Sequence, residues 1–155
     1  MDKKLTELMD KKIEQAERYH EISSKMIYED IDGVTEMLDR REKLIAKIDG
    51  ISAEIKSYVN AQSVERKELL EDMFSFKEVG ELSGELLEIQ ERLLKYKELK
   101  HKINEADRAI YKHLKQMQNE LAAEMNKSNR SKQVIDYFSQ TSIDVNKGKK
   151  LNTSN

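Results

Sequence analysis

The chain has 155 residues, with 28 Lys and Arg against 30 Asp and Glu, and its hydrophobic and charged fractions are both 37%. It contains no Pro, no Cys and no Trp, and only five Gly. So few turn-forming residues argue against a many-turned β-sandwich or barrel, whereas a composition rich in Lys, Glu and Leu is typical of long helices. The absence of cysteine excludes disulfides, thiolate metal sites and cysteine nucleophiles.

The first half of the chain predicts two amphipathic helices. Apolar residues spaced by three and four positions predict a helix over about residues 3–28. Asp30 or Asp32 can then cap a second helix, which carries apolar residues as far as Val59. Because matched amphipathic helices joined by a short connection pack side by side, we expect an antiparallel hairpin.

The second half predicts a short helix and a long one. Ser63 is a candidate cap for a helix over about residues 64–76, and Gly80 and Gly84 then permit a bend. From about residue 83 to 125 the helical pattern is almost unbroken, which favours a coiled coil or an extended bundle. The predicted fold class is therefore all-α: a helical hairpin, a short helix and a long C-terminal helix in an extended, coiled-coil-like bundle.

The chain divides into a helical bundle domain, residues 1–127, and a tail, residues 128–155. The tail is rich in Asn, Ser, Lys and Thr, and such a composition predicts that it is mostly disordered. It contains one short apolar segment, Val-Ile-Asp-Tyr-Phe at residues 134–138. This segment either packs back on the bundle or docks on another protein, and the residues alone leave both interpretations open.

Charge and hydropathy bear on the partners and the cellular location that we expect for this protein. From residue 127 onward the net charge is +4, so the remainder of the chain is acidic at −6. A nucleic-acid-binding protein would instead carry a basic stripe on its folded body, and we expect no nucleic acid as a partner. The N-terminus lacks the apolar region of a secretory signal, and no apolar run is long enough for a membrane span. We therefore expect a cytoplasmic protein with no direct membrane insertion.

Two Glu-x-x-His pairs, Glu17/His20 and Glu98/His101, have the spacing of di-iron carboxylate sites. Such a site requires that all ligands project into the bundle. At about 100° per residue, Glu17 lies roughly 120° and His20 roughly 60° from the centre of the first apolar stripe, and Glu98 and His101 lie well over about 100° from the second. We therefore expect no metal site. No phosphate-binding loop or catalytic motif is present either, so we expect no cofactor and no enzyme activity.

Arg41 lies on the apolar face of the second predicted helix, beside Val34, Leu44 and Ile48. We expect its stem to be covered and its guanidinium to reach solvent or an acid on a neighbouring helix. Contact with a partner protein is the alternative.

The N-terminal half of the long helix is apolar on two sides. Leu86 and Leu93 share one side, and Leu87 and Leu94 lie about 100° away. One side can face the hairpin. The other either receives the short helix or remains a groove for a partner helix, and the sequence does not decide whether residues 64–76 cover it.

Three stretches resemble FlgN-like flagellar type III export chaperones. EDIDGVTEMLDRREKLIAKIDGI, Glu29 to Ile51, resembles the first helical turnaround of that family: an acidic turn, then a helix with a basic residue, Arg41, shortly before paired apolar residues. LKHKINEADRAIYKHLKQM, Leu99 to Met117, is similar to the late long helix, although Asp107 stands where the family often has asparagine. VIDYFSQTSIDVNKGKK, Val134 to Lys150, is similar to the tails of Gram-positive-type members.

The resemblance implies a small, all-helical cytoplasmic chaperone. Family members bind the C-terminal helices of hook–filament junction proteins and deliver them to the export gate. By that analogy, the client would dock on apolar helical surfaces, for which the candidate residues are Leu86, Leu87, Leu93 and Leu94. Tyr137, with its apolar neighbours Ile135 and Phe138, would contact the cytoplasmic domain of the gate, which favours the docking interpretation of the tail segment.

The alternative function is a structural coiled-coil adaptor that self-associates through its long helix and has no chaperone role. A chaperone could also form a homodimer while no client is bound. The residues do not identify the client or the stoichiometry.

Overall fold

The computed structural model describes residues 3–124, 132 and 134–139, and within this part of the chain every regular element is helical. Four helices have defined bounds: α1 (Lys4–Met26), α2 (Ile31–Asn60), α3 (Val64–Phe74) and α4 (Glu85–Ala123). Residues 134–139 form a further short helix, called here the tail helix. The all-α prediction is confirmed.

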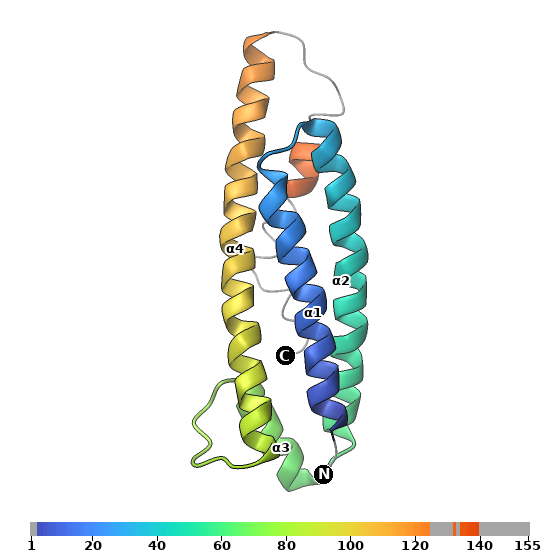
Figure 1. Ribbon diagram of the computed structural model, residues 1–155, viewed down its shortest axis with the longest axis vertical. Coiled ribbons are helices and arrows are strands. Elements are labelled where there is room, and N and C mark those ends of the chain that lie inside the picture. The colour runs from blue at the N-terminus through green and yellow to red at the C-terminus, as the bar shows by residue number, and fades with distance from the viewer. Residues whose placement is uncertain (1–2, 125–131, 133, 140–155) are drawn as a thin grey trace.

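The three long helices form an elongated bundle (Figure 1). α1 lies between α2 and α4 and packs on both, and the short α3 lies at the end of the bundle where α2 finishes. α1 and α2 are antiparallel, as the hairpin prediction requires. α4 runs parallel to α1 and extends beyond the connection between α1 and α2.

The caps explain where the helices begin. Asp30, and not Asp32, caps α2, because its side chain accepts a hydrogen bond from the backbone N–H of Gly33 at 2.8 Å. Ser63 caps α3 by accepting from the N–H of Arg66 at 3.4 Å, as predicted. A Cβ at position 33 would lie 2.4 Å from a carboxylate oxygen of Glu29, so a larger residue there would displace the Glu29 side chain.

The connection between α3 and α4 bends where the sequence predicts. Gly80 and Gly84 have φ values of +79° and +57°, a region that favours glycine. Phe76 also has a positive φ, +58°, which is rare for a bulky side chain and costs on the order of 1 kcal/mol or more. α3 ends at Phe74, before this strained residue, so the predicted helix end at residue 76 is two residues too late.

Three core clusters follow one another along the bundle. The lower cluster, near α3, joins all four numbered helices: Leu5, Leu8, Met9, Ile55, Val59, Leu70, Met73, Ile89 and Leu93. The middle cluster joins α1, α2 and α4: Ile13, Ala16, Tyr19, Leu44, Ile48, Leu99 and Ile103. The upper cluster adds the tail helix: Met26, Val34, Leu38, Ile110, Leu114, Val134, Ile135 and Phe138.

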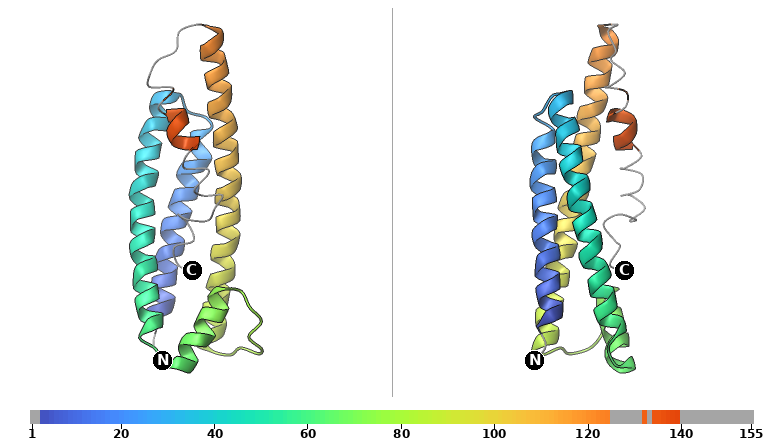
Figure 2. Two further views of the ribbon diagram at one scale, coloured as in Figure 1. Left: turned by 180° about the vertical axis from the view of Figure 1, so that it is seen from behind. Right: turned by 90° about the vertical axis from the view of Figure 1, so that its right-hand side faces the viewer.

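The tail helix lies between α2 and α4 on the face opposite α1 (Figure 2). Its residues Val134, Ile135 and Phe138 are 5%, 4% and 1% exposed. In this conformation, then, the apolar segment packs back on the bundle, the first of the two interpretations above. The predicted disorder of the rest of residues 128–155 lies outside the described residues. None of the described helices is long and apolar enough to cross a lipid bilayer.

Candidate functional site

The four candidate client-binding leucines on α4 divide into two pairs. Leu93 is 7% exposed and belongs to the lower cluster, and Leu86 packs partly buried against the same cluster. Leu87 and Leu94 are 42% and 53% exposed. Leu86 and Leu93 therefore hold the bundle together, so we call Leu87 and Leu94 alone the leucine face. α3 packs on the other side, through Leu70 and Met73, and leaves this face uncovered.

A broad hollow lies next to the leucine face, between α4 and the connection that follows α3. Its volume is about 800 Å³, and Met73, Phe76, Leu93 and Leu94 supply its apolar walls. Phe76 is 46% exposed, and the Lys97 Nζ lies 4.6 Å from the centre of its ring. We call this surface the α4 hollow. Lys77, Glu78, Gln90 and Lys97 also line it, so its surface mixes polar and apolar groups, and its breadth suits a helix better than a small ligand.

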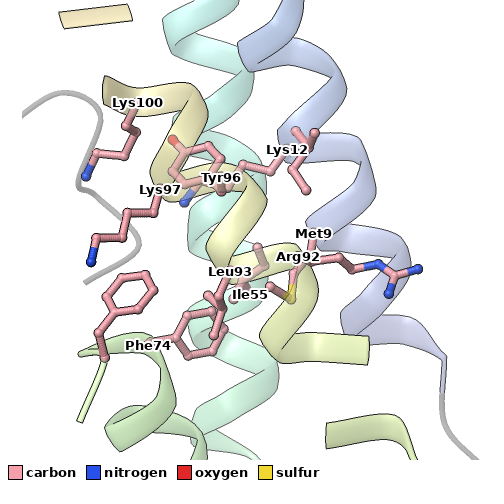
Figure 3. Close-up of a pocket in the computed structure, with 11 residues that line it drawn as sticks. Met9, Lys12, Ile55, Phe74, Arg92, Leu93, Tyr96, Lys97 and Lys100 are labelled. Atoms are coloured by element: carbon pink, nitrogen blue, oxygen red, sulfur yellow. The ribbon is translucent and has the colours of Figure 1, made fainter. Parts of the chain in front are cut away.

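A smaller cavity of about 60 Å³, the lysine pocket, adjoins the hollow and shares Phe76, Leu93 and Lys97 with it. Its walls are apolar and aromatic, and the charged residues that line it are all basic: Lys12, Arg92, Lys97 and Lys100. Figure 3 shows the Lys12 side chain extending from α1 to Tyr96 on α4. Lys12 is only 4% exposed.

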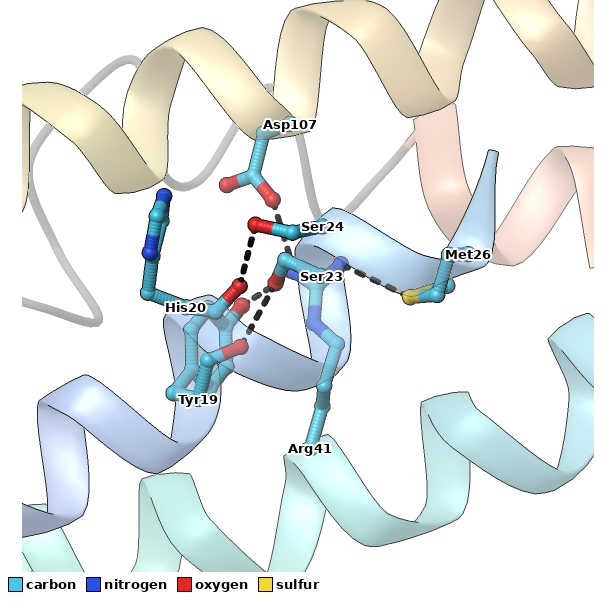
Figure 4. A network of polar contacts seen from close by, with 7 residues as sticks. All are labelled: Tyr19, His20, Ser23, Ser24, Met26, Arg41 and Asp107. Atoms are coloured by element: carbon cyan, nitrogen blue, oxygen red, sulfur yellow. Dashed lines mark hydrogen bonds and ion pairs between the residues drawn. The ribbon is translucent and has the colours of Figure 1, made fainter. Parts of the chain in front are cut away.

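A buried ion pair links the long helices in the upper half of the bundle. Arg41 on α2 donates from Nη2 to Oδ1 of Asp107 on α4 at 2.9 Å, and the two side chains are 2% and 6% exposed. Arg41 also donates to the hydroxyl of Tyr19 on α1 and lies 3.5 Å from the sulfur of Met26 (Figure 4). The prediction that Arg41 reaches an acid on a neighbouring helix is confirmed, whereas the solvent alternative is wrong.

Burial dominates the protonation of this ion-pair cluster. It raises the pKa of the Asp107 carboxyl above its ordinary value, with Arg41 opposing the shift. It also raises the pKa of the Tyr19 hydroxyl to about 12, so that this group stays protonated at neutral pH. The hydrogen bonds of Arg41 to Tyr19 and Asp107 connect α1, α2 and α4, so the cluster holds three helices together.

The tail helix packs against this ion-pair cluster. The Phe138 ring centre lies 5.7 Å from the Arg41 guanidinium and 6.2 Å from the ring of Tyr111. Tyr137 is half-buried, and its hydroxyl donates to a carboxylate oxygen of Glu42 on α2. Of the three candidate gate-docking residues, Ile135 and Phe138 are thus buried against the bundle, and only Tyr137 lies partly at the surface.

The two Glu-x-x-His pairs do not assemble into a site. Among the described residues, no three His, Asp or Glu side chains come together in a group that could hold a metal ion. His101 instead lies 3.1 Å from Glu105 on its own helix, and both side chains are exposed.

Lys12 and Asp107 are two further buried charges, and the sequence pattern did not lead us to expect their burial. Each interrupts an apolar stripe at helical spacing: Lys12 follows Leu8 by four residues, and Asp107 follows Ile103 by four. The same signal singled out Arg41, and applied to every helix it would have found both.

No protein-family model, curated protein or solved structure matches this chain.

Proposed function

We propose that this protein is a non-enzymatic cytoplasmic chaperone that binds an apolar helix of a client. The observation that carries the proposal is the exposed leucine face on α4, which lies beside the broad, partly apolar α4 hollow. The resemblance of three stretches to FlgN-like export chaperones supplies the client class: the C-terminal helices of hook–filament junction proteins. Delivery to the type III export gate is the second half of the proposal.

The proposed gate-docking role of the tail requires that the tail helix leave the bundle. Burial of Val134, Ile135 and Phe138 contributes about 1.5–3 kcal/mol each, while ordering six residues costs about 1–2 kcal/mol per residue. These opposing terms are similar in size, so release of the tail helix is energetically accessible. Tyr137, already partly exposed, would make the first contact with the gate.

Co-purification tests the proposed function. The tagged protein is isolated from its own cells, and the proteins that elute with it are identified by mass spectrometry. We expect the wild type to bring down a junction protein in stoichiometric amount. A variant in which Leu87 and Leu94 are both changed to Ser should bring down much less of it. A preparation that contains no junction protein contradicts the proposal.

The structural adaptor is the second candidate, and one observation favours it. Leu87 and Leu94 are exposed and seven residues apart, the spacing of a coiled-coil seam. Sedimentation velocity separates the two functions. A tight dimer that persists on dilution and is broken by the double Ser variant supports the adaptor. A monomer that forms a stable one-to-one complex with client supports the chaperone.

A further inference from the structure

The lysine pocket has an unbalanced charge. Arg92 is neutralised by Asp10, because its Nε and Nη2 donate to the two carboxylate oxygens at 2.8 and 3.3 Å. Lys12, Lys97 and Lys100 form no ion pair with any residue in the part of the chain that the structure describes. Three cations therefore line a small, largely apolar cavity in which no acidic side chain takes part.

Lys12 is the most unusual of the three. Its Nζ lies 4.4 Å from the centre of the Tyr96 ring, a contact that attracts the ammonium. Burial, and secondly the charge of Lys100, lower the pKa of Lys12 to about 7, while Asp49 on α2 opposes this shift. The same cavity walls that disfavour the bare ammonium would strengthen its attraction to an anion.

We propose that the lysine pocket binds a carboxylate side chain that a partner protein inserts from the apolar face of one of its helices. The proposal deepens the helix-binding function above and rests on it. The volume of the lysine pocket limits its ligand to a few atoms, about the size of one side-chain end group. The adjoining α4 hollow is more than ten times larger. A helix lying in the hollow can therefore place one acidic side chain between Lys12 and Lys100.

This arrangement would make client selection depend on charge as well as on apolar area. A client helix with Glu among its apolar residues would dock, and an otherwise equal helix with Gln would leave the pocket cations unpaired. Because a bound carboxylate raises the pKa of Lys12, binding takes up a proton above about pH 7, and affinity should fall as the pH rises. Arg92 and Lys97 on α4 also line the pocket and attract the carboxylate, whereas Asp49 on α2, which acts on Lys12, repels it.

The test uses two small mimics of the Glu and Gln side chains, butyrate and butyramide. Each is titrated into the full chain and followed by the NMR signals of residues that line the pocket, such as Met9 and Ile55. We expect saturable shifts with butyrate, at least about tenfold weaker binding of butyramide, and loss of the butyrate response in Lys12→Met. The matched control is Lys11→Met, an exposed neighbour on α1, which should respond as the wild type does. Equal responses to both mimics, or an unchanged response in Lys12→Met, overturn the proposal.

A second arm tests the source of the carboxylate. Two synthetic amphipathic helices, identical except for Glu or Gln on the Leu-rich face, compete with butyrate. Displacement by the Glu peptide alone supports the proposal. If butyrate binds and neither peptide displaces it, the pocket takes a free acid, and the assignment to a partner helix is wrong. Neither arm uses a junction protein, so a failure here is distinguishable from a failure of the chaperone proposal.

Discussion

Arg41 and Asp107 are 66 residues apart in the chain, yet their side chains meet at 2.9 Å in the interior of the bundle, where both are almost completely buried. The pair joins α2 to α4, two helices that each pack mainly on α1. Arg41 Nε and Asp107 Oδ2 have no hydrogen-bond partner among the described residues. The pair is therefore incompletely satisfied, and its contribution should depend on both members being present.

The first prediction concerns this pair. Changing Asp107→Ala or Arg41→Ala leaves one buried charge without its counter-ion, and each should lower the free energy of unfolding by about 3–5 kcal/mol. The double variant Arg41→Met with Asp107→Leu should lose less than either single variant, because no buried charge remains. Urea unfolding of the set measures this. A double variant less stable than both single variants would contradict this prediction.

The second prediction concerns pH. The pKa of Lys12 is lowered from 10.5 to about 7 in the folded chain, so between these values the unfolded chain binds more protons. The free energy of unfolding should therefore rise with pH, by on the order of 1–2 kcal/mol from about pH 7 to pH 9. Burial also lowers the pKa of Lys100, which adds to the effect, while the raised pKa values of Tyr19 and Tyr96 keep both neutral in this range.

Urea unfolding at several pH values measures this pH dependence of the free energy of unfolding. Lys12→Met should be more stable than the wild type near pH 7 and should show a much smaller rise with pH, because the buried cation is gone. Lys11→Met, at an exposed position of the same helix, should retain the wild-type dependence. The same pH dependence in all three proteins would mean that Lys12 keeps its ordinary pKa.

The third prediction concerns the tail helix. Phe138→Ala removes the ring that lies against Arg41 and Tyr111, so residues 134–139 should detach while the three long helices persist. Hydrogen exchange should show at least about a tenfold loss of amide protection confined to the tail helix and the adjoining upper cluster. Tyr28→Ala, at a side chain that is 83% exposed, is the control and should change nothing. If amide protection is unchanged in Phe138→Ala, the contacts that hold the tail helix on the bundle do not involve the Phe138 ring.

The helices could be predicted from the sequence because apolar spacing and capping residues are set by neighbouring positions in the chain. The spacing of apolar residues located all four numbered helices, and Asp30 and Ser63 capped the helices expected of them. The acid that pairs with Arg41 could be expected as a class. Its identity could not, because Asp107 becomes its neighbour only when α2 and α4 pack on the same side of α1.

The candidate site was harder to predict because it depends on how helices that are distant in the sequence pack against one another. The sequence separated Leu86 and Leu93 from Leu87 and Leu94 by angle, but the rotation of α4 against α1 decides which pair is buried. Docking of the tail helix depends on a groove made by two distant helices, which no pattern within residues 134–138 encodes. Lys12 had a local signal, yet its pocket is completed by Phe74 and Tyr96 from other helices.

Isothermal titration calorimetry tests the central claim, that the leucine face binds a client helix. A C-terminal helical fragment of a junction protein is titrated into the wild type, into the double variant Leu87→Ser with Leu94→Ser, and into Val64→Ser. Val64 is 74% exposed on α3, outside the leucine face, and serves as the control. Because burying each leucine contributes about 1.5–3 kcal/mol, we expect micromolar one-to-one binding that the double variant weakens at least about tenfold and Val64→Ser leaves unchanged. No heat of binding in the wild type, or equal affinity in the double variant, would contradict it.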